Sequence, residues 1–270
     1  MSLAASPDRK CPIISLASTK GGVGKTTLAY VLVTEMARRL GAGAASGTSR
    51  HGRVTCIDAD PNRTLAQVLS LTNDPRIVCI ESDSDRLLAD LRQAQANSDL
   101  VVIDLEGTAN QAMLYAAGKS DLVLVPAQPS RFDVVEAVKT IGVVRKAADL
   151  VGREIAHRVV LSRTPVLRQR VADHSRAQFV RAGLPLLPVE LVQRAAFQSM
   201  TYTGKPPWRQ DGGEQAAANV VSIVDAIMAI VGWDVVSVEG ARAEAAGAGT
   251  SGVDAGRDRV PARQGVQTVA

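Results

Sequence analysis

The 270-residue sequence is poor in aromatic side chains, with two tryptophans, three tyrosines and three phenylalanines. Hydrophobic residues still make up 46% of the chain, so its core must be built from Ala, Val, Leu and Ile. That mixture is typical of buried parallel strands covered by helices rich in small residues. The shortage of rings therefore favours an α/β domain.

Cysteines and long apolar runs are also scarce. Cys11, Cys56 and Cys79 form no C-x-x-C pair, so we expect small buried thiols in a reducing compartment. No run reaches the roughly 18 to 20 apolar residues that span a bilayer. The opening "MSLAASPDRK" lacks the apolar core of a signal peptide. These absences predict a cytoplasmic protein without a membrane partner.

Apolar runs alternate with helical patterns along most of the chain. The helical patterns cover 24–40, 84–96 and 131–150. This alternation predicts an α/β fold with a mostly parallel twisted sheet of about seven strands and helices on both faces. In such a sheet, ligands bind beyond the carboxyl ends of the strands. The expected strands are 11–18, 53–60, 76–82, 99–107, 121–130, 156–165 and 184–189.

The composition divides the chain into three parts. From about Glu239 the sequence is rich in Ala and Gly and contains no Leu, Ile, Met or aromatic residue. Such a segment buries too little apolar surface to offset the entropy lost on ordering. We predict a short extension at 1–10, one domain at 11–235 and a disordered tail at 236–270.

The stretch "STKGGVGKTT" (18–27) departs from a common phosphate-binding pattern, G-x-x-x-x-G-K-[ST]. Gly24, Lys25 and Thr26 match the end of the pattern. Its first glycine should fall at Thr19, and a second lysine, Lys20, follows. The alternative, a plain glycine turn, explains neither the position between a strand and a helix nor the G-K-T sequence.

The loop predicts an ATP and Mg²⁺ site. Glycines let the backbone N–H groups approach phosphate oxygens, and the helix that follows directs its positive end at the same point. We expect Lys25 to reach the β- and γ-phosphates, Thr26 to bind Mg²⁺ and Thr27 to contact the α-phosphate. The predicted nucleotide-binding residues are Gly21, Gly22, Val23, Gly24, Lys25, Thr26 and Thr27.

Two strand ends supply carboxylates for the metal and the attacking water. "CIDADPN" contains Asp58 and Asp60, and "VVIDLEG" contains Asp104. We assign the water to Asp60 and the outer magnesium shell to Asp104, and Asp58 is the weaker candidate. The predicted metal site is thus Thr26, Asp60 and Asp104. The alternative for each aspartate is a cap of the next helix.

"KGGVGKTT" resembles the deviant Walker A motif of the ParA/MinD ATPases, and the similarity extends over residues 11–235. In that family the lysine at the position of Lys20 reaches the nucleotide of the other subunit of a dimer. The resemblance implies a hydrolytic role for Asp60, and Asn62 stands where glutamine is usual. It therefore makes Lys20, Lys25 and Asp60 the catalytic candidates.

The segment after the fourth expected strand departs from the family's D-x-P-P. It reads Asp104-Leu105-Glu106-Gly107-Thr108. Gly107 retains a backbone N–H for the γ-phosphate, whereas Glu106 has no assigned counterpart. We expect this switch to differ from that of a typical ParA protein.

Other branches of the family fit less well. MinD-type proteins end in a basic amphipathic helix, whereas the apolar stripe within 220–231 is uncharged apart from Asp225 and predicts a last core helix. The cysteines are not placed to bridge an iron–sulfur cluster, and the tyrosine cluster of bacterial tyrosine kinases is absent.

Positive charge is concentrated between Arg153 and Arg209, where ten basic residues face three acids, although the whole chain is only +4. This favours contacts with a phosphate backbone without base readout; the alternative is a solvated arginine-rich face. The candidates are Arg168, Arg170 and Arg194. The segment 163–200 is similar to the VirC ATPases of T-DNA transfer, and "TGKPPW" (203–208) resembles the G-K-P of ParA proteins.

The resemblance implies an ATP-dependent homodimer that binds DNA non-specifically, associates with the nucleoid and hydrolyses ATP slowly. A ParB-like centromere-binding partner would accelerate hydrolysis during plasmid or chromosome partition. Two alternatives stay open: a positioning ATPase for a protein cargo or a T-DNA relaxosome, and an ATP-dependent metabolic ligase.

Overall fold

A computed structural model describes residues 11–43, 51–167 and 170–233 of the chain. The chain forms two units, Met1–Val236 and Ser237–Ala270, and all described residues lie in the first. The predicted extension at 1–10 and the predicted tail at 236–270 lie outside the described residues.

The described part of the chain contains one seven-stranded sheet in which every pairing is parallel, in the order β3-β2-β4-β1-β5-β6-β7. The central strands are buried on both faces, which explains their continuous apolar sequences. The strands are β1 (Ile13–Leu16), β2 (Val54–Ala59), β3 (Ile77–Glu81), β4 (Leu100–Leu105), β5 (Leu122–Ala127), β6 (Ala156–Thr164) and β7 (Leu191–Val192).

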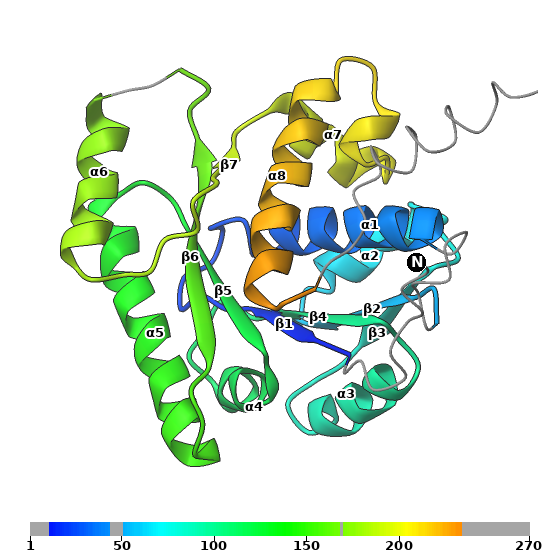
Figure 1. Ribbon diagram of the computed structural model, residues 1–270, viewed down its shortest axis with the longest axis horizontal. Coiled ribbons are helices and arrows are strands. Elements are labelled where there is room, and N and C mark those ends of the chain that lie inside the picture. Colours follow the sequence, from blue (N-terminus) through cyan, green and yellow to red (C-terminus); the bar gives the residue numbers. More distant parts are fainter. Residues whose placement is uncertain (1–10, 44–50, 168–169, 234–270) are drawn as a thin grey trace, which may run out of the picture. The chain divides into compact units, whose positions relative to one another are not determined.

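Helices cover both faces of the sheet (Figure 1). On one face, helices α1, α2, α7 and α8 pack over a core that includes Leu28, Leu65 and Val220; on the other, α3 to α6 pack over Leu91, Met113 and Phe179. The predicted fold class is therefore confirmed. The helices are α1 (Lys25–Gly43), α2 (Thr64–Ser70), α3 (Leu87–Ala96), α4 (Gln111–Lys119), α5 (Arg131–Val151), α6 (Arg170–Arg181), α7 (Ala195–Thr203), the 3-10 helix η2 (Pro207–Arg209) and α8 (Glu214–Ile230).

The seventh strand was expected at 184–189, and this expectation is wrong. Only an isolated bridge joins Leu186 to Val159, and the strand itself is Leu191–Val192. Pro185 and Pro188 lack the N–H groups that a continuing ladder needs.

The apolar stripe of α8 faces the core, as its sequence predicts. Val220, Ile223, Val224 and Ile227 are fully buried. Within the described ranges, no helix is both long enough and apolar enough to cross a bilayer.

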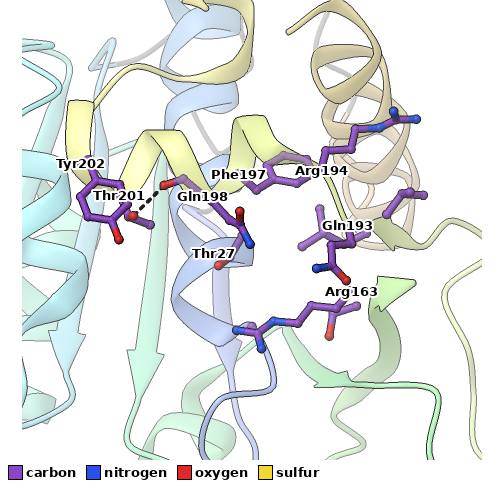
Figure 2. Close-up of a pocket in the computed structure, with 12 residues that line it drawn as sticks. Thr27, Arg163, Gln193, Arg194, Phe197, Gln198, Thr201 and Tyr202 are labelled. Carbon is purple, nitrogen blue, oxygen red and sulfur yellow. Dashed lines mark hydrogen bonds between the residues drawn. The ribbon is translucent and has the colours of Figure 1, made fainter. Parts of the chain in front are cut away.

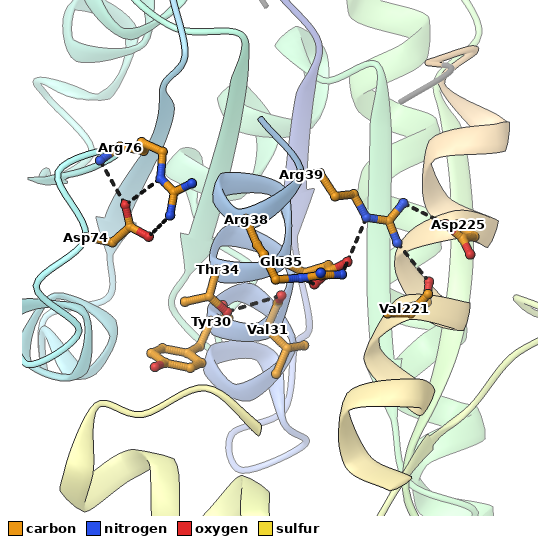
Figure 3. Close-up of polar contacts among 10 residues, drawn as sticks. All are labelled: Tyr30, Val31, Thr34, Glu35, Arg38, Arg39, Asp74, Arg76, Val221 and Asp225. Carbon is orange, nitrogen blue, oxygen red and sulfur yellow. Dashed lines mark hydrogen bonds and ion pairs between the residues drawn. The ribbon is translucent and has the colours of Figure 1, made fainter. Parts of the chain in front are cut away.

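Helix α1 is anchored by a partly buried ionic network (Figure 3). Glu35 is fully buried and accepts hydrogen bonds from Arg38 and Arg39. Arg39 also donates to Asp225 of α8 at 2.6 Å, and Arg38 lies over the ring of Trp208 in η2, 5.4 Å from its centroid. Because every charge is paired, the network fixes α1, and the loop before it, against α8 and η2.

Candidate nucleotide-binding site

The phosphate loop joins β1 to α1 at the carboxyl edge of the sheet. Gly22 and Gly24 have φ of 74° and 96°, a conformation that favours glycine. Ser162 at the end of β6 donates a hydrogen bond to the carbonyl of Val23. The loop is therefore shaped by its glycines and tied to a strand from a distant part of the sequence.

Thr19, which replaces the first glycine of the common pattern, ties the loop to α5. Its backbone N–H donates to the hydroxyl of Thr140 at 3.0 Å, and its own hydroxyl donates to the Glu136 carboxylate at 2.8 Å. A glycine could form only the first of these contacts. No sequence pattern indicates this role, because both partners lie more than 100 positions away.

The two lysines of the loop have different surroundings. Lys25 is 7% exposed and lies at the N-terminus of α1. Burial lowers its pKa, and the nearby charges of Asp104, Asp60 and Glu106 oppose that shift. Lys20 lies outside this cluster: its ammonium group is 2.9 Å from the carboxylate of Asp133 in the first turn of α5.

The surroundings of Asp133 orient its carboxylate toward a cation. It is 1% exposed, and its carboxylate accepts hydrogen bonds from the hydroxyl of Ser130 and the backbone N–H of Gln128. The side chain of Lys20 remains 38% exposed. This ion pair holds Lys20 away from the nucleotide site of its own chain.

Asp104 lies at the carboxyl end of β4, where the sequence predicts it. Its Oδ2 accepts a hydrogen bond of 2.8 Å from the hydroxyl of Thr26, while its buried Oδ1 has no hydrogen-bond partner among the described residues. Burial raises the pKa of Asp104 to about 7; Thr26 and Lys25 oppose this shift, and Asp58 and Asp60 add to it.

The donor set fits Mg²⁺. A threonine hydroxyl, an aspartate beside it and an unpartnered carboxylate oxygen are the ligands that Mg²⁺ uses together with waters and phosphates. In the described ranges, no group of three or more His, Cys, Asp or Glu side chains forms a cage that could bind a metal alone. The ion would therefore depend on the phosphates of a nucleotide.

Asp58 and Asp60 have separate environments. Asp58 is fully buried and accepts from the backbone N–H groups of Ala66 and Asp60, so it secures the start of α2. Burial raises its pKa. Asp60 is partly exposed and lines the same cavity as Lys25. Asp58 thus contacts the first turn of α2, whereas Asp60 lines the cavity.

The switch segment after β4 lies directly against the phosphate loop. A Cβ atom on Gly107 would lie 3.1 Å from the Cα and backbone N of Gly21 and 3.2 Å from the carbonyl carbon of Lys20. Glu106, which had no assigned role, lines the cavity and accepts a hydrogen bond from Asn110, the residue that caps α4.

These elements enclose a polar cavity of about 400 Å³. Its lining comes from four separate sequence segments and includes Asp60 and most of the predicted residues of the phosphate loop, while the Asp104 carboxylate accepts a hydrogen bond from Thr26. The cavity is lined by Gly21, Gly22, Gly24, Lys25, Thr26, Thr27, Asp60, Asn62, Glu106, Gly107, Thr108 and Arg163.

A second cavity, of about 480 Å³, adjoins the first at Thr27 (Figure 2). Its other walls come from the ends of β6 and β7 and from one side of α7. They combine the ring of Phe197 with the amides of Gln193 and Gln198, which suits a flat, polar-edged group. Sequence reasoning missed this cavity, because its residues belong to no contiguous motif.

The three DNA-binding candidates are not brought together by described contacts. Arg168 lies outside the described residues, and Arg170 is the first residue of α6. Arg194 lines the second cavity and donates to Gln215 at 2.6 Å. Elsewhere in the basic segment, Arg176 is paired with Glu190 and Asp173.

Comparison with known proteins places this geometry in a family. The model of the family described as VirC1 protein matches residues 11–206. The chain belongs to the VirC1 family. It is also similar to two proteins of Rhizobium radiobacter: Protein ParA, with 29% identity over 72% of this chain and 83% of the relative, and Protein virC1, with 27% identity over 71% and 81%.

Solved structures agree on the fold. Apo McdA from Cyanthece superimposes with a TM-score of 0.67 at 18% identity, over 80% of this chain and 99% of McdA. With the family match, this confirms the resemblance to ParA/MinD proteins on which the interpretation of the phosphate loop rests.

Proposed function

We propose that this chain is a ParA-type ATPase that binds ATP with Mg²⁺ and closes into a homodimer. As a dimer it would bind DNA non-specifically and hydrolyse ATP slowly to drive plasmid or chromosome partition. The observation that carries the proposal is the separation of the two loop lysines. Lys25 lines the phosphate cavity, whereas Lys20 lies outside it on an ion pair with Asp133.

The residues around the cavities support an ATP site. Phosphates fit the glycine loop and Lys25, Mg²⁺ fits Thr26 and Asp104, and a base fits the second cavity between Phe197 and the glutamine side chains. Asp60 lines the phosphate cavity, which suits a residue that orients the attacking water. Bound Mg²⁺ would neutralise charge that develops on the phosphates.

Lys20 supports the dimer. A lysine that is 38% exposed and held by one carboxylate can exchange that partner for the phosphates of a facing subunit. In the closed dimer, Lys20 would add positive charge beside the partner's nucleotide, while Lys25 would contact the nucleotide of its own subunit. DNA contacts through Arg168, Arg170 and Arg194, association with the nucleoid and a ParB-like activator belong to the same proposal.

The test is retention of non-specific duplex DNA at low salt, with ATP, ADP or no nucleotide. Wild-type protein should retain DNA only with ATP and Mg²⁺. Lys20→Ala should abolish retention and dimer formation but still bind ADP, and Arg170→Glu should abolish retention but still dimerise. Absence of DNA binding in every nucleotide state would contradict the partition role.

A second candidate is a positioning ATPase for a protein cargo or a T-DNA relaxosome, favoured by the match to the VirC1 family over residues 11–206. An ATP-dependent dimer that binds no DNA would support it. Turnover of ATP only with a small-molecule acceptor would instead support a metabolic ligase.

A further inference from the structure

Strand β6 contains an irregularity beside the nucleotide site. Ser162 pairs with Leu191 and Thr164 with the next residue, Val192, so Arg163 is an extra residue with no partner on β7. Bulges of this kind are frequent next to active sites, where they redirect a side chain. Arg163 has a φ of 52°.

A left-handed conformation is unfavourable for a residue with a Cβ atom, and glycine adopts it freely. Two other non-glycine residues in the described ranges share it, Arg63 and Asn73. The guanidinium group of Arg63 donates to the carbonyls of Asp58 and Ser82, and these contacts hold Arg63 in the left-handed conformation. Asparagine tolerates the conformation.

Arg163 has no such structural contact. Its side chain is exposed and makes no hydrogen bond or ion pair with any other described residue. A strained backbone that presents an unpaired cation beside a cavity is typical of a functional residue. The strain therefore points to a ligand that the side chain contacts.

The position of Arg163 indicates which part of a bound nucleotide its side chain would contact. Arg163, Gly24 and Thr27 line both the phosphate cavity and the second cavity, and Arg163 is the charged one of the three. Figure 2 shows its side chain extending from β6 toward the side on which Thr27 lies. A nucleotide with its base in one cavity and its terminal phosphates in the other must cross between them at the α-phosphate.

We propose that Arg163 binds the α-phosphate and so positions the nucleotide across the two cavities. This inference rests on the proposed ATP site and adds a residue to it. A guanidinium group offers paired N–H donors to two phosphate oxygens, a geometry that lysine does not provide. Arg163 would thus secure the base end of the nucleotide without taking part in hydrolysis.

The experiment measures binding of ATP, ADP and AMP by displacement of a fluorescent ADP analogue. For Arg163→Ala, affinity should fall roughly tenfold to hundredfold, and by a similar factor for all three nucleotides, because all three carry the α-phosphate. Arg163→Lys should recover only part of the loss. Turnover at saturating ATP should change less than the KM.

Two further variants separate the effect of the left-handed backbone from the effect of the Arg163 side chain. Arg163→Gly should lose as much affinity as Arg163→Ala but melt at a higher temperature, since glycine relieves the left-handed strain. Asn73→Gly changes another left-handed residue, outside both cavities, and should bind ADP like wild type.

Three outcomes would overturn the inference: wild-type affinity in Arg163→Ala, a loss confined to ATP, or a melting temperature of Arg163→Gly below that of Arg163→Ala. Failure of the wild-type protein to bind any nucleotide would instead contradict the ATP site itself.

Discussion

The phosphate cavity and the second cavity are adjacent but are built differently. Around the phosphates, Lys25 and Asp104 are 7% and 1% exposed, and the loop is tied to α5, β6 and the switch segment. Around the second cavity, the amides of Gln193 and Gln198 lie beside the buried ring of Phe197, and Tyr202 is 85% exposed. The first cavity is built around buried charges, whereas the second combines amide groups with an aromatic ring.

This difference indicates that the two cavities contribute differently to nucleotide binding. Buried charges such as those of Lys25 and Asp104 interact strongly, so the phosphate cavity should supply most of the affinity and all of the chemistry. The second cavity, with its exposed amides, should contribute less binding free energy and should select the base. Substitutions on the two sides should therefore differ in both size and kind.

The largest expected effect concerns Asp104 on the phosphate side. Its pKa rises from 3.8 to about 7 on folding, so in the range between these values the unfolded state releases a proton that the folded state keeps. Stability without nucleotide and Mg²⁺ should fall as pH rises through this range and level off above about 7. Asp104→Asn removes this dependence and should be more stable than wild type, by up to about 4 kcal/mol at pH 8.

Urea unfolding of both proteins between pH 5 and pH 8 measures that difference. Mg²⁺ with ADP should reduce it, because the cation favours the charged carboxylate. A difference that does not grow with pH would show that burial of Asp104 does not control the stability of the empty site.

Lys25→Ala should weaken ATP binding about a hundredfold or more, because charge-assisted hydrogen bonds to two phosphates are lost. Calorimetric titration of ATP measures this. Lys205→Ala, which removes an exposed lysine that lines neither cavity, is the control. If both variants bound ATP within a factor of ten of wild type, the phosphate cavity would not dominate the affinity.

The sequence predicted the fold class and most of the phosphate cavity because both depend on local patterns. Residues 18–27 are contiguous, and Asp60 and Asp104 follow apolar strands whose ends share one edge of a parallel sheet. Helices α2 and α7, with seven and nine residues, were not expected, because short segments show too few helical repeats to be recognised.

The second cavity and the contacts of Thr19 depend on tertiary structure. Thr27 lines the same cavity as Gln193 and Gln198 only because of the strand order of the sheet, in which β7 lies two positions from β5. Glu136 and Thr140 reach Thr19 because α5 packs beside the phosphate loop. No spacing in the sequence encodes either proximity.

Gly107→Ala tests the contact between the switch segment and the phosphate loop. The added Cβ would press against backbone atoms of Gly21 and Lys20 at 3.1–3.2 Å, so one segment must shift. ATP turnover should fall roughly tenfold, as expected for a small misplacement of catalytic groups, while ADP affinity changes less. Gly142→Ala adds a Cβ with nothing within 4 Å and should leave turnover intact. Wild-type turnover in both variants would argue against a close switch contact.

Gln198→Ala tests the nucleoside side. Its amide faces the cavity beside Thr27 (Figure 2), and its loss should weaken ATP binding roughly threefold to tenfold and reduce the preference for ATP over GTP. Gln93→Ala makes the same change at an exposed position of α3. A hundredfold loss for Gln198→Ala would remove the contrast between the two cavities.

The smallest effect should come from Asp133, which holds Lys20 at the border of the phosphate side. Asp133→Asn keeps an oxygen that can accept from the N–H of Gln128 but loses the charge that pairs with Lys20. Because Lys20 is 38% exposed and the pair is partly screened, the release should strengthen dimerisation with a slowly hydrolysed ATP analogue by about fivefold or less. Sedimentation at 50 and 300 mM salt measures it, and the gain should shrink at the higher concentration. A weaker dimer in Asp133→Asn, with an unchanged melting temperature, would mean that Asp133 serves the closed dimer directly instead of restraining Lys20 in the monomer.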